Sequence, residues 1–449
     1  MNVQRGWRSC IKCDTLFYAP LASICTKGGS HDGGTRPAYL PYVGGQPGCQ
    51  ENWRWCKRCG VMFFGGGDGG RCRAGGAHDP SGSGNYALRL GPPVGRGQGG
   101  WRWCCQCQSL FSMGGNNGTC PATNQAHNAS GSSEYSLSTE LTGEGVVATF
   151  EGKGDSGEIW MTIKIGSSWI APVRVPGGCS GTPMPIMFEK KLWIFYRGMG
   201  NSYDLWYTTY DGFEFSESRQ VPGVRTRGVP CPTVVNGSLS VWVQGTSDSK
   251  TLWRCRRDTD ARWISNDFSK TYHIWNDPAG TTVKYKNGTD VVLVAFERAK
   301  CAEAAEVYSA TGDLTVAGWK DISPTSSGGH ASGSSATPGI VAFKGKVYLF
   351  HEGGGHDGNL YVHSAPIPTH HDDRLDFSPA SRIPNVGISG TPSPVVDGDT
   401  LLVLHEGMGD NGELWCVSTT DGAHWSADQR VSNIGVSGSC GVTRYRFDP

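Results

Sequence analysis

Charge is scarce and balanced in this chain of 449 residues, in which 40 Lys and Arg face 40 Asp and Glu. A formal net charge of zero excludes a generally basic nucleic-acid-binding protein. Long hydrophobic runs are missing too, since no apolar stretch reaches the roughly 18 residues that a membrane span needs. Residues 1–7 hold no apolar segment of the signal-peptide type, which leaves the compartment open between the cytoplasm and non-classical secretion.

Glycine, by contrast, is abundant, at 66 of 449 residues, or about twice its average usage. The glycines are spread through segments rich in Trp, Val and Ile, a pattern that is not typical of disordered chains. Many short strands joined by glycine turns would produce this composition. We therefore predict an all-β protein.

The amino-terminal third contains three copies of one pattern, which begin 46 and then 48 residues apart. Each copy has a Trp, a C-x2-C pair followed by Leu/Met-Phe, a third Cys, a His and a Tyr. The Cys and His residues are Cys10, Cys13, Cys25 and His31, then Cys56, Cys59, Cys72 and His78, then Cys104, Cys107, Cys120 and His127. We place the three modules at residues 1–48, 49–97 and 98–140.

The spacing C-x2-C-x11/12-C-x5/6-H is typical of a metal site, because a C-x2-C turn offers two thiolates to one ion. We predict three structural Zn²⁺ sites of the Cys3His type, with protein filling all four positions. A disulfide framework is the alternative, but three patterned Cys per copy cannot all pair within a copy. We also expect the Trp and Phe of each copy to pack over the C-x2-C turn. Cys49 and Cys105 lie outside the pattern.

Nucleic-acid binding by these modules is disfavoured. Residues 1–140 hold 13 Lys and Arg against 7 Asp and Glu, and no basic stripe is sustained. The spacing also differs from the zinc-knuckle and C2H2 patterns.

A second, longer repeat fills residues 145–449. Each copy has an apolar run, a polar residue, a glycine turn and then an aromatic, and successive aromatics are 46, 47, 55, 53 and 54 residues apart. The candidate ligand-binding pairs of polar residue and aromatic are Glu151 with Trp160, Arg197 with Trp206, Gln244 with Trp253, Glu352 with Tyr361 and Glu406 with Trp415. The fourth copy, Glu297 to Glu303 with Tyr308, departs from the pattern and is either a specialised site or a decayed blade.

Each copy predicts four short strands, which at a period near 50 residues is typical of a propeller blade. For the clearest copy we expect strands at 394–397, 400–405, 414–418 and 425–431. The first copy lacks an innermost strand, and residues 439–445 form an orphan strand at the other end of the chain. We therefore predict a six-bladed β-propeller whose last blade is closed by both ends of the chain.

The segment 419–425, Thr-Thr-Asp-Gly-Ala-His-Trp, resembles the Asp-box turn of sialidase-like propellers, with Asp and Gly adjacent instead of separated. The rhythm of glycine turn, Leu-Trp, Asp-Gly and Trp is also similar to that of six-bladed propeller lectins. The resemblance covers residues 145–449 at the level of the repeat pattern. It implies a six-bladed propeller, and for lectins of that kind it implies sugar binding between blades.

Binding of glycans or glycoproteins is the favoured function. Carbohydrate sites combine hydroxyl-binding polar groups with aromatic faces, and weak sites repeated round a ring gain avidity. The same polar residues could instead hydrogen-bond neighbouring blades, with the aromatics filling the core. Sialidase-like hydrolysis and a protein-interaction scaffold stay open as alternatives. The expected innermost strands carry no carboxylate pair, so we assign no catalytic residue.

Overall fold

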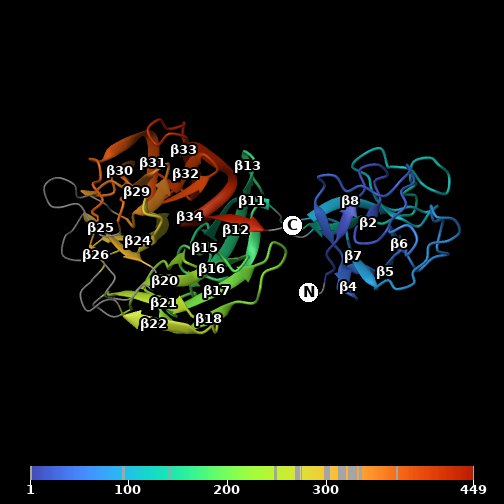
Figure 1. The fold of residues 1–449 in the computed structure, drawn as a ribbon, viewed down its shortest axis with the longest axis horizontal. Coiled ribbons are helices and arrows are strands. Elements are labelled where there is room, and N and C mark those ends of the chain that lie inside the picture. Colours follow the sequence, from blue (N-terminus) through green and yellow to red (C-terminus); the bar gives the residue numbers. More distant parts are fainter. Residues whose placement is uncertain are drawn as a thin grey trace. The chain divides into compact units, whose positions relative to one another are not determined.

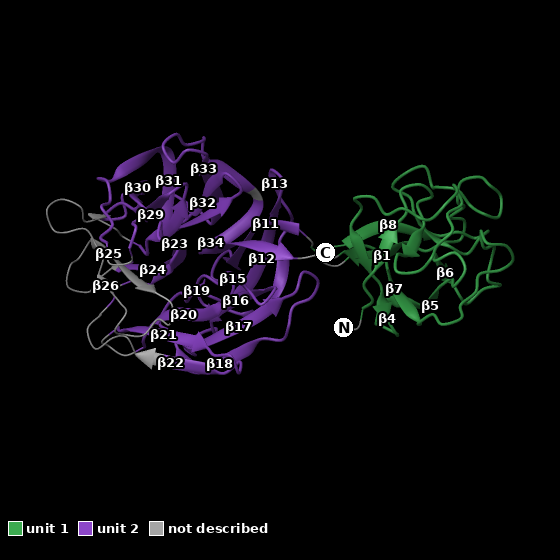
Figure 2. Ribbon diagram, viewed as in Figure 1, with its two compact units in different colours: residues 1–141 green, residues 142–449 purple. Residues whose placement is uncertain are grey.

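The computed structural model describes residues 3–93, 97–139, 141, 143–246, 250–267, 274, 276–297, 304–311, 320–321, 331–332, 336–370 and 373–447. Two compact units divide the chain, residues 1–141 and residues 142–449 (Figure 2). Both are built from strands, and the described residues contain no helix. Accordingly, none of them forms a helix able to cross a membrane. Residues 298–303 of the divergent fourth copy lie outside the described residues.

Each repeat of the first unit forms a hairpin around its C-x2-C turn and then a third strand. In the first repeat these are β1 (Trp7–Ser9), β2 (Leu16–Tyr18), β3 (Ala38–Leu40) and the short β4 (Tyr42–Val43). The second repeat has β5 (Cys49–Trp55), β6 (Met62–Phe64) and β7 (Tyr86–Leu90). The third has β8 (Gly97–Trp103), β9 (Leu110–Ser112) and β10 (Tyr135–Thr139).

The third strands of the repeats pair with one another in a closed cycle. β3 pairs with β10, β10 pairs with β7, and β7 pairs with β4, which continues the path of β3. Single bridges between the hairpins repeat the cycle: Phe17 with Val61, Phe63 with Ser109, and Thr15 with Phe111. The three repeats therefore share one sheet and one core, like a trimer made within a single chain.

The second unit consists of six antiparallel blades arranged as a ring (Figure 1). Blade 1 comprises β11 (Gly143–Gly152), β12 (Glu158–Ile165), β13 (Ser168–Trp169) and β14 (Val173–Gly178). Blade 2 comprises β15 (Met184–Phe188), β16 (Lys191–Arg197), β17 (Asp204–Tyr210) and β18 (Arg219–Arg225). Blade 3 comprises β19 (Cys231–Val235), β20 (Ser238–Gln244), β21 (Leu252–Arg257) and β22 (Trp263–Asp267).

The remaining blades follow the same order. Blade 4 comprises β23 (Ala279–Lys284), β24 (Asp290–Glu297), β25 (Ala304–Thr311), β26 (Lys320–Asp321) and β27 (Ala331–Ser332). Blade 5 comprises β28 (Gly339–Phe343), β29 (Lys346–Glu352), β30 (Asn359–Pro366) and the first part of β31 (Ser381–Asp397). Blade 6 comprises the second part of β31, β32 (Thr400–Gly407), β33 (Glu413–Thr419) and the first part of β34 (Gln429–Phe447).

The predicted closure of the ring is confirmed. The second part of β34 pairs with β11 in continuous register, which places Val442 opposite Ala148 and Thr443 opposite Val147. It thereby supplies the innermost strand of blade 1. The hydroxyl of Thr182 donates to the carbonyl of Ser439 at 3.1 Å, which ties this strand to blade 2 as well. Closure leaves no open sheet edge between the first and last blades.

One predicted strand boundary in blade 6 is wrong. The fourth strand begins at Gln429, so Trp425 lies in the preceding loop and not in a strand. The Asp-box-like segment forms a turn closed on itself, because Asp421 Oδ1 accepts the backbone N–H groups of Ala423 and His424 at 2.9 and 2.8 Å. These bonds are local, so they account for the turn without a ligand.

Candidate functional sites: cysteine–histidine clusters and an inter-blade cleft

A tight turn presents the first two cysteines of each cluster. In the first repeat, Cys10 accepts the N–H of Asp14 at 3.0 Å and donates its own N–H to Thr15 at 2.9 Å. The residue after the second cysteine adopts a left-handed conformation in every repeat: Asp14 (φ 57°), Gly60 (φ 78°) and Gln108 (φ 66°). Such a conformation lets the chain reverse sharply, so that both sulfurs point to the same side.

The four ligand atoms of each cluster lie within 4.8 Å of one another. The first and third cysteine sulfurs are 3.9, 3.8 and 3.9 Å apart in the three repeats, and the second sulfur is 3.4, 3.5 and 3.4 Å from the histidine Nδ1. A tetrahedral ion with Zn–S and Zn–N bonds of ordinary length would give edges of ~3.8 and ~3.6 Å. All these cysteines are free, and their sulfur separations are far from a disulfide length of ~2.05 Å. Each cluster can therefore hold a metal ion.

The ligands of each cluster are buried together, and hydrogen bonds between them bear on their protonation. Every ligand in the three clusters is buried except His31, which is almost so. A hydrogen bond from Cys13 lowers the pKa of the Cys10 thiol to about 3 against the opposing effect of burial, and the same pairing raises the pKa of Cys13. A lowered thiol pKa favours the thiolate, which is the form that binds metals.

The phenylalanine of each repeat stacks on the histidine ligand, with ring centroids 5.0, 4.7 and 4.9 Å apart. The expectation that the tryptophan also packs over the turn is wrong. Trp7, Trp53 and Trp101 instead meet a tyrosine of another repeat edge-on, at 5.3, 5.1 and 5.0 Å. They lie in the core that the three repeats share.

Each C-x2-C turn is also covered by the preceding repeat in the cycle. The N–H of Ile24 donates to the carbonyl of Cys59 at 3.4 Å. A side chain at Gly70 would come within 2.4 Å of the Cys107 carbonyl, and one at Gly118 within 1.9 Å of the Cys13 carbonyl. In addition, His78 Nε2 lies 3.0 Å from the Cys107 carbonyl oxygen, which fixes the ring with Nδ1 facing the cluster. The three clusters are thus linked to one another.

In the propeller, the five polar residues of the candidate pairs, Glu151, Arg197, Gln244, Glu352 and Glu406, hydrogen-bond backbone groups. Glu151 accepts the N–H of Gly157 in its own turn at 3.0 Å and that of Gly181, in the loop to the next blade, at 2.8 Å. Glu406 and Glu352 make the corresponding bonds with Gly412 at 2.9 Å and Gly390 at 3.2 Å. Burial raises the pKa of Glu406.

The two polar residues of these pairs that are not acidic also hydrogen-bond the backbone. Gln244 donates to the Ile274 carbonyl at 3.0 Å, and Arg197 donates to the Ser180 carbonyl at 3.1 Å. The five polar residues therefore join turns to neighbouring loops, which favours the structural alternative for them.

The aromatics of the set, Trp160, Trp206, Trp253, Tyr361 and Trp415, are all half-buried on the third strand of their blades. The nitrogen edge of each indole packs against the turn glycine of its own blade. A side chain at Gly152, Gly198, Gly245 or Gly407 would come within 3.0, 2.9, 2.7 or 2.7 Å of the indole nitrogen. This contact explains why the repeat pairs a glycine with the following aromatic.

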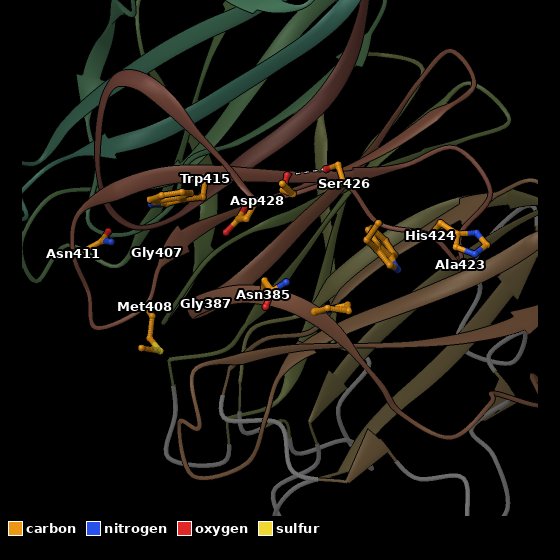
Figure 3. Close-up of a pocket in the computed structure, with 13 residues that line it drawn as sticks. Asn385, Gly387, Gly407, Met408, Asn411, Trp415, Ala423, His424, Ser426 and Asp428 are labelled. Carbon is orange, nitrogen blue, oxygen red and sulfur yellow. Dashed lines mark hydrogen bonds between the residues drawn. The ribbon is translucent and has the colours of Figure 1, made fainter.

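A cleft of about 860 Å³ lies between blades 5 and 6 (Figure 3). Its lining includes Asn385, Met408, Asn411, Trp415, Trp425 and Asp428. Figure 3 shows Trp415 and Asp428 close together, with Asn411 and Met408 at one end of the cleft and His424 at the other. The cleft thus offers two aromatic side chains, two amides and one carboxylate.

A buried histidine holds Asp428 in this cleft, and a backbone bulge positions Asn385. Asp428 Oδ1 lies 3.2 Å from Nε2 of the fully buried His405, whose Nδ1 lies 3.0 Å from the Glu406 carbonyl oxygen. Asn385 occupies a left-handed bulge (φ 58°) in the outer strand of blade 5. The same bulge recurs at Gly177, Gly223 and Asn433, residue types that tolerate this conformation.

Of the ten residues expected to bind ligand, the structure brings one, Trp415, into this cleft, and a smaller cleft contains Trp253. Sequence reasoning missed Asn385, Asn411, Trp425 and Asp428. One sequence signal for Asn385 was available. A Gly or Asn follows a proline at Pro222 and at Pro384, and this residue adopts the left-handed conformation where the outer strand bends next to the following blade.

No family model matches the chain, and neither does any curated protein sequence. Among solved structures, the chain is similar to the lectin of Aleuria aurantia, described as a six-bladed β-propeller that recognises fucose, with 10% identity, a TM-score of 0.43, and coverage of 67% of this chain and 98% of the lectin. AofleA from Arthrobotrys oligospora has 9% identity and a TM-score of 0.46, with 68% and 90% covered. An α-L-arabinofuranosidase from Fusarium graminearum has 14% identity and a TM-score of 0.34, with 47% and 68% covered.

Proposed function

We propose that the propeller binds carbohydrate in the cleft between blades 5 and 6. The observation that carries the proposal is the lining itself, in which Trp415 and Trp425 face the same space as Asn411 and Asp428. An indole covers the apolar face of a sugar ring, while amide and carboxylate oxygens accept its hydroxyl groups. Because backbone amides occupy the polar residues of the repeat, we assign ligand contact to the aromatics and loop residues.

Binding is favoured over hydrolysis at this place. Glycoside hydrolysis ordinarily uses two carboxylates that flank the scissile bond. Among the described residues that line the cleft, Asp428 is the one carboxylate, and it is paired with His405. A protein-interaction scaffold would not need a concave site that combines indoles with amides.

We propose that the ring binds more than one glycan, because a second cleft, which contains Trp253, lies at the equivalent interface between blades 2 and 3. The side chains at the other interfaces differ. Lys153 reaches across to the Asn411 carbonyl at 2.9 Å where blade 6 meets blade 1, while Met199 lies against Gly178 where blade 1 meets blade 2. We propose a multivalent lectin whose sites are unequal in strength.

For the first unit we propose three structural Zn²⁺ ions. Three thiolates and one imidazole at tetrahedral spacing suit zinc, and all four positions come from protein. Elemental analysis of the purified protein should find about three zinc ions per chain. A content near zero in protein prepared without chelator would overturn this assignment.

A glycan array followed by calorimetry with the best saccharide tests carbohydrate binding. Trp415→Ala should weaken binding about tenfold or more, or ~1.4 kcal/mol, since it removes the surface on which the sugar packs. Trp415→Phe should keep part of the affinity. Trp169→Ala, in a half-buried tryptophan of blade 1 outside the cleft lining, serves as the matched control. Equal affinities for the wild type and Trp415→Ala would place the saccharide elsewhere.

A further inference from the structure

A second cleft, of about 230 Å³, lies between blades 2 and 3. Its lining includes Gly223, Arg225, Thr246, Trp253, Arg254 and Ser265. It occupies the same place in the repeat as the first cleft. Gly223 (φ 69°) is the left-handed bulge residue that corresponds to Asn385, and Trp253 corresponds to Trp415.

The two clefts differ in charge. Arg225 lies two residues after the bulge residue, at the position that Gly387 has in the first cleft. Arg254 directly follows Trp253, at the position that Cys416 has in blade 6. Arg254 points to the opposite face of blade 3 from Trp253, so the second cleft gains one guanidinium group beside its aromatic residue, that of Arg225. The acidic group on this part of blade 2 is Asp204, which lies 3.9 Å from Arg225 Nε and accepts a hydrogen bond from the Ser202 hydroxyl.

Both arginines are held by their surroundings. Arg254 is 2% exposed, donates from Nε to the Ser240 hydroxyl at 3.0 Å and lies 5.6 Å from the centre of the Trp242 ring. Arg225 stacks against Tyr203 at 5.7 Å, and its side chain stays 54% exposed. The Arg254 guanidinium is thus fixed within the blade next to Trp242, whereas the Arg225 guanidinium lies at the surface within reach of a ligand.

We infer that the cleft between blades 2 and 3 binds an acidic saccharide, one that carries a carboxylate such as that of a uronic acid, with its ring on Trp253 and its anionic group toward Arg225. This inference rests on the proposed function and assigns a ligand class to a second site. A planar guanidinium matches a carboxylate in shape and charge, and partial burial strengthens the pair.

Two glycosides that differ by one group test the inference, namely methyl β-D-glucuronide and methyl β-D-glucoside. Titrated by NMR into the full-length protein, the glucuronide should bind at least tenfold more tightly than the glucoside. Arg225→Gln should remove that preference, and rising salt should weaken glucuronide binding. Arg262→Gln is the control, because this exposed arginine of blade 3 pairs with Asp260 and does not line the cleft.

Trp415→Ala separates this inference from the proposed function. The glucuronide preference should survive that substitution and be lost in Trp253→Ala. Equal binding of both glycosides by the wild type, no effect of Arg225→Gln, or loss of the preference in Trp415→Ala would each overturn the acidic site. Saccharide binding in the cleft between blades 5 and 6 would stand in all three cases.

Discussion

Single glycines position the aromatic side chains that the repeat displays. Gly407 is the clearest case, because a methyl group there would lie 2.4 Å from Asn411 Nδ2 and 2.7 Å from Trp415 Nε1. The repeat pattern in the sequence places Gly407 and Trp415 in one copy at a fixed spacing, but it does not single out Asn411. The sequence does not tell which of Glu406 and Trp415 is available to a ligand, because the pattern of one sequence does not show which side chain is buried against the turn.

Gly407→Ala should lower the free energy of unfolding of the propeller by about 1–3 kcal/mol, the usual cost of overpacking. It should also weaken saccharide binding by shifting Trp415. Denaturant unfolding followed by fluorescence measures the first effect. In a Trp415→Phe background the same substitution should cost less, since the phenyl ring lacks the clashing indole nitrogen. An equal cost in both backgrounds would contradict the contact.

A histidine pair in blade 5 should make stability depend on pH. His351 and His363 are 1% and 2% exposed, with their Nε2 atoms 3.1 Å apart. Burial lowers the pKa of both, despite hydrogen bonds to the carbonyls of Glu352 and Ser378. The unfolded chain therefore takes up protons first, so stability should fall as the pH drops below about 6.5, by at most ~1.4 kcal/mol per pH unit for each histidine.

Thermal unfolding between pH 7.5 and 5.5 tests this pair. The melting temperature of the propeller should decrease on acidification, and the decrease should be smaller in His363→Gln. Parallel profiles for the wild type and this variant would show that the pair does not contribute.

Among the strands, the one that closes the ring should contribute most to the stability of the propeller. The second part of β34 pairs with β11 from Gly143↔Phe447 to Phe150↔Cys440. A chain that lacks residues 439–449 would expose the edge of β11, and we expect its propeller not to fold, because the lost pairing and core contacts rival the ~5–15 kcal/mol that stabilises a whole domain. Circular dichroism and thermal unfolding would detect this.

The control for the deletion is Arg444→Ala, which removes a side chain from the same strand and keeps the backbone pairing. Its ion pair with Glu144 is exposed and should contribute little. A deletion variant with the wild-type melting temperature would contradict the role of the strand in closing the ring.

The blades and their closure were predictable from the sequence because the period and the strand patterning are local. The cyclic pairing of β3, β7 and β10 was not, because all three repeats carry the same pattern and nothing local specifies which copy pairs with which. That Asn385 and Asp428 line one cleft was not predictable either, since they come from different blades and are brought together only by the packing of blade 5 against blade 6.

At the scale of the whole molecule, the metal clusters should behave as one cooperative set. The Cys59 carbonyl of the second cluster accepts from the first repeat, and the Cys107 carbonyl of the third contacts His78 of the second. Loss of one ion therefore removes support from its neighbours. Cys59→Ser should release more than one zinc equivalent, and chelator should unfold residues 1–141 in a single transition.

Elemental analysis together with circular dichroism measures this cooperativity. Cys49→Ser is the matched control, because Cys49 belongs to no cluster and should leave the metal content unchanged. The propeller has its own core, so its transition should persist after chelation. If Cys59→Ser lost only one zinc ion and the rest of residues 1–141 stayed folded, the linkage of the clusters would be contradicted.

The most direct test of the central claim is a crystal structure of the protein with the saccharide that the glycan array selects. We expect a sugar ring packed on Trp415 between blades 5 and 6, with hydroxyl groups toward Asn411 and Asp428. A saccharide bound away from this cleft, or no saccharide in crystals whose cleft is open to solvent, would contradict it.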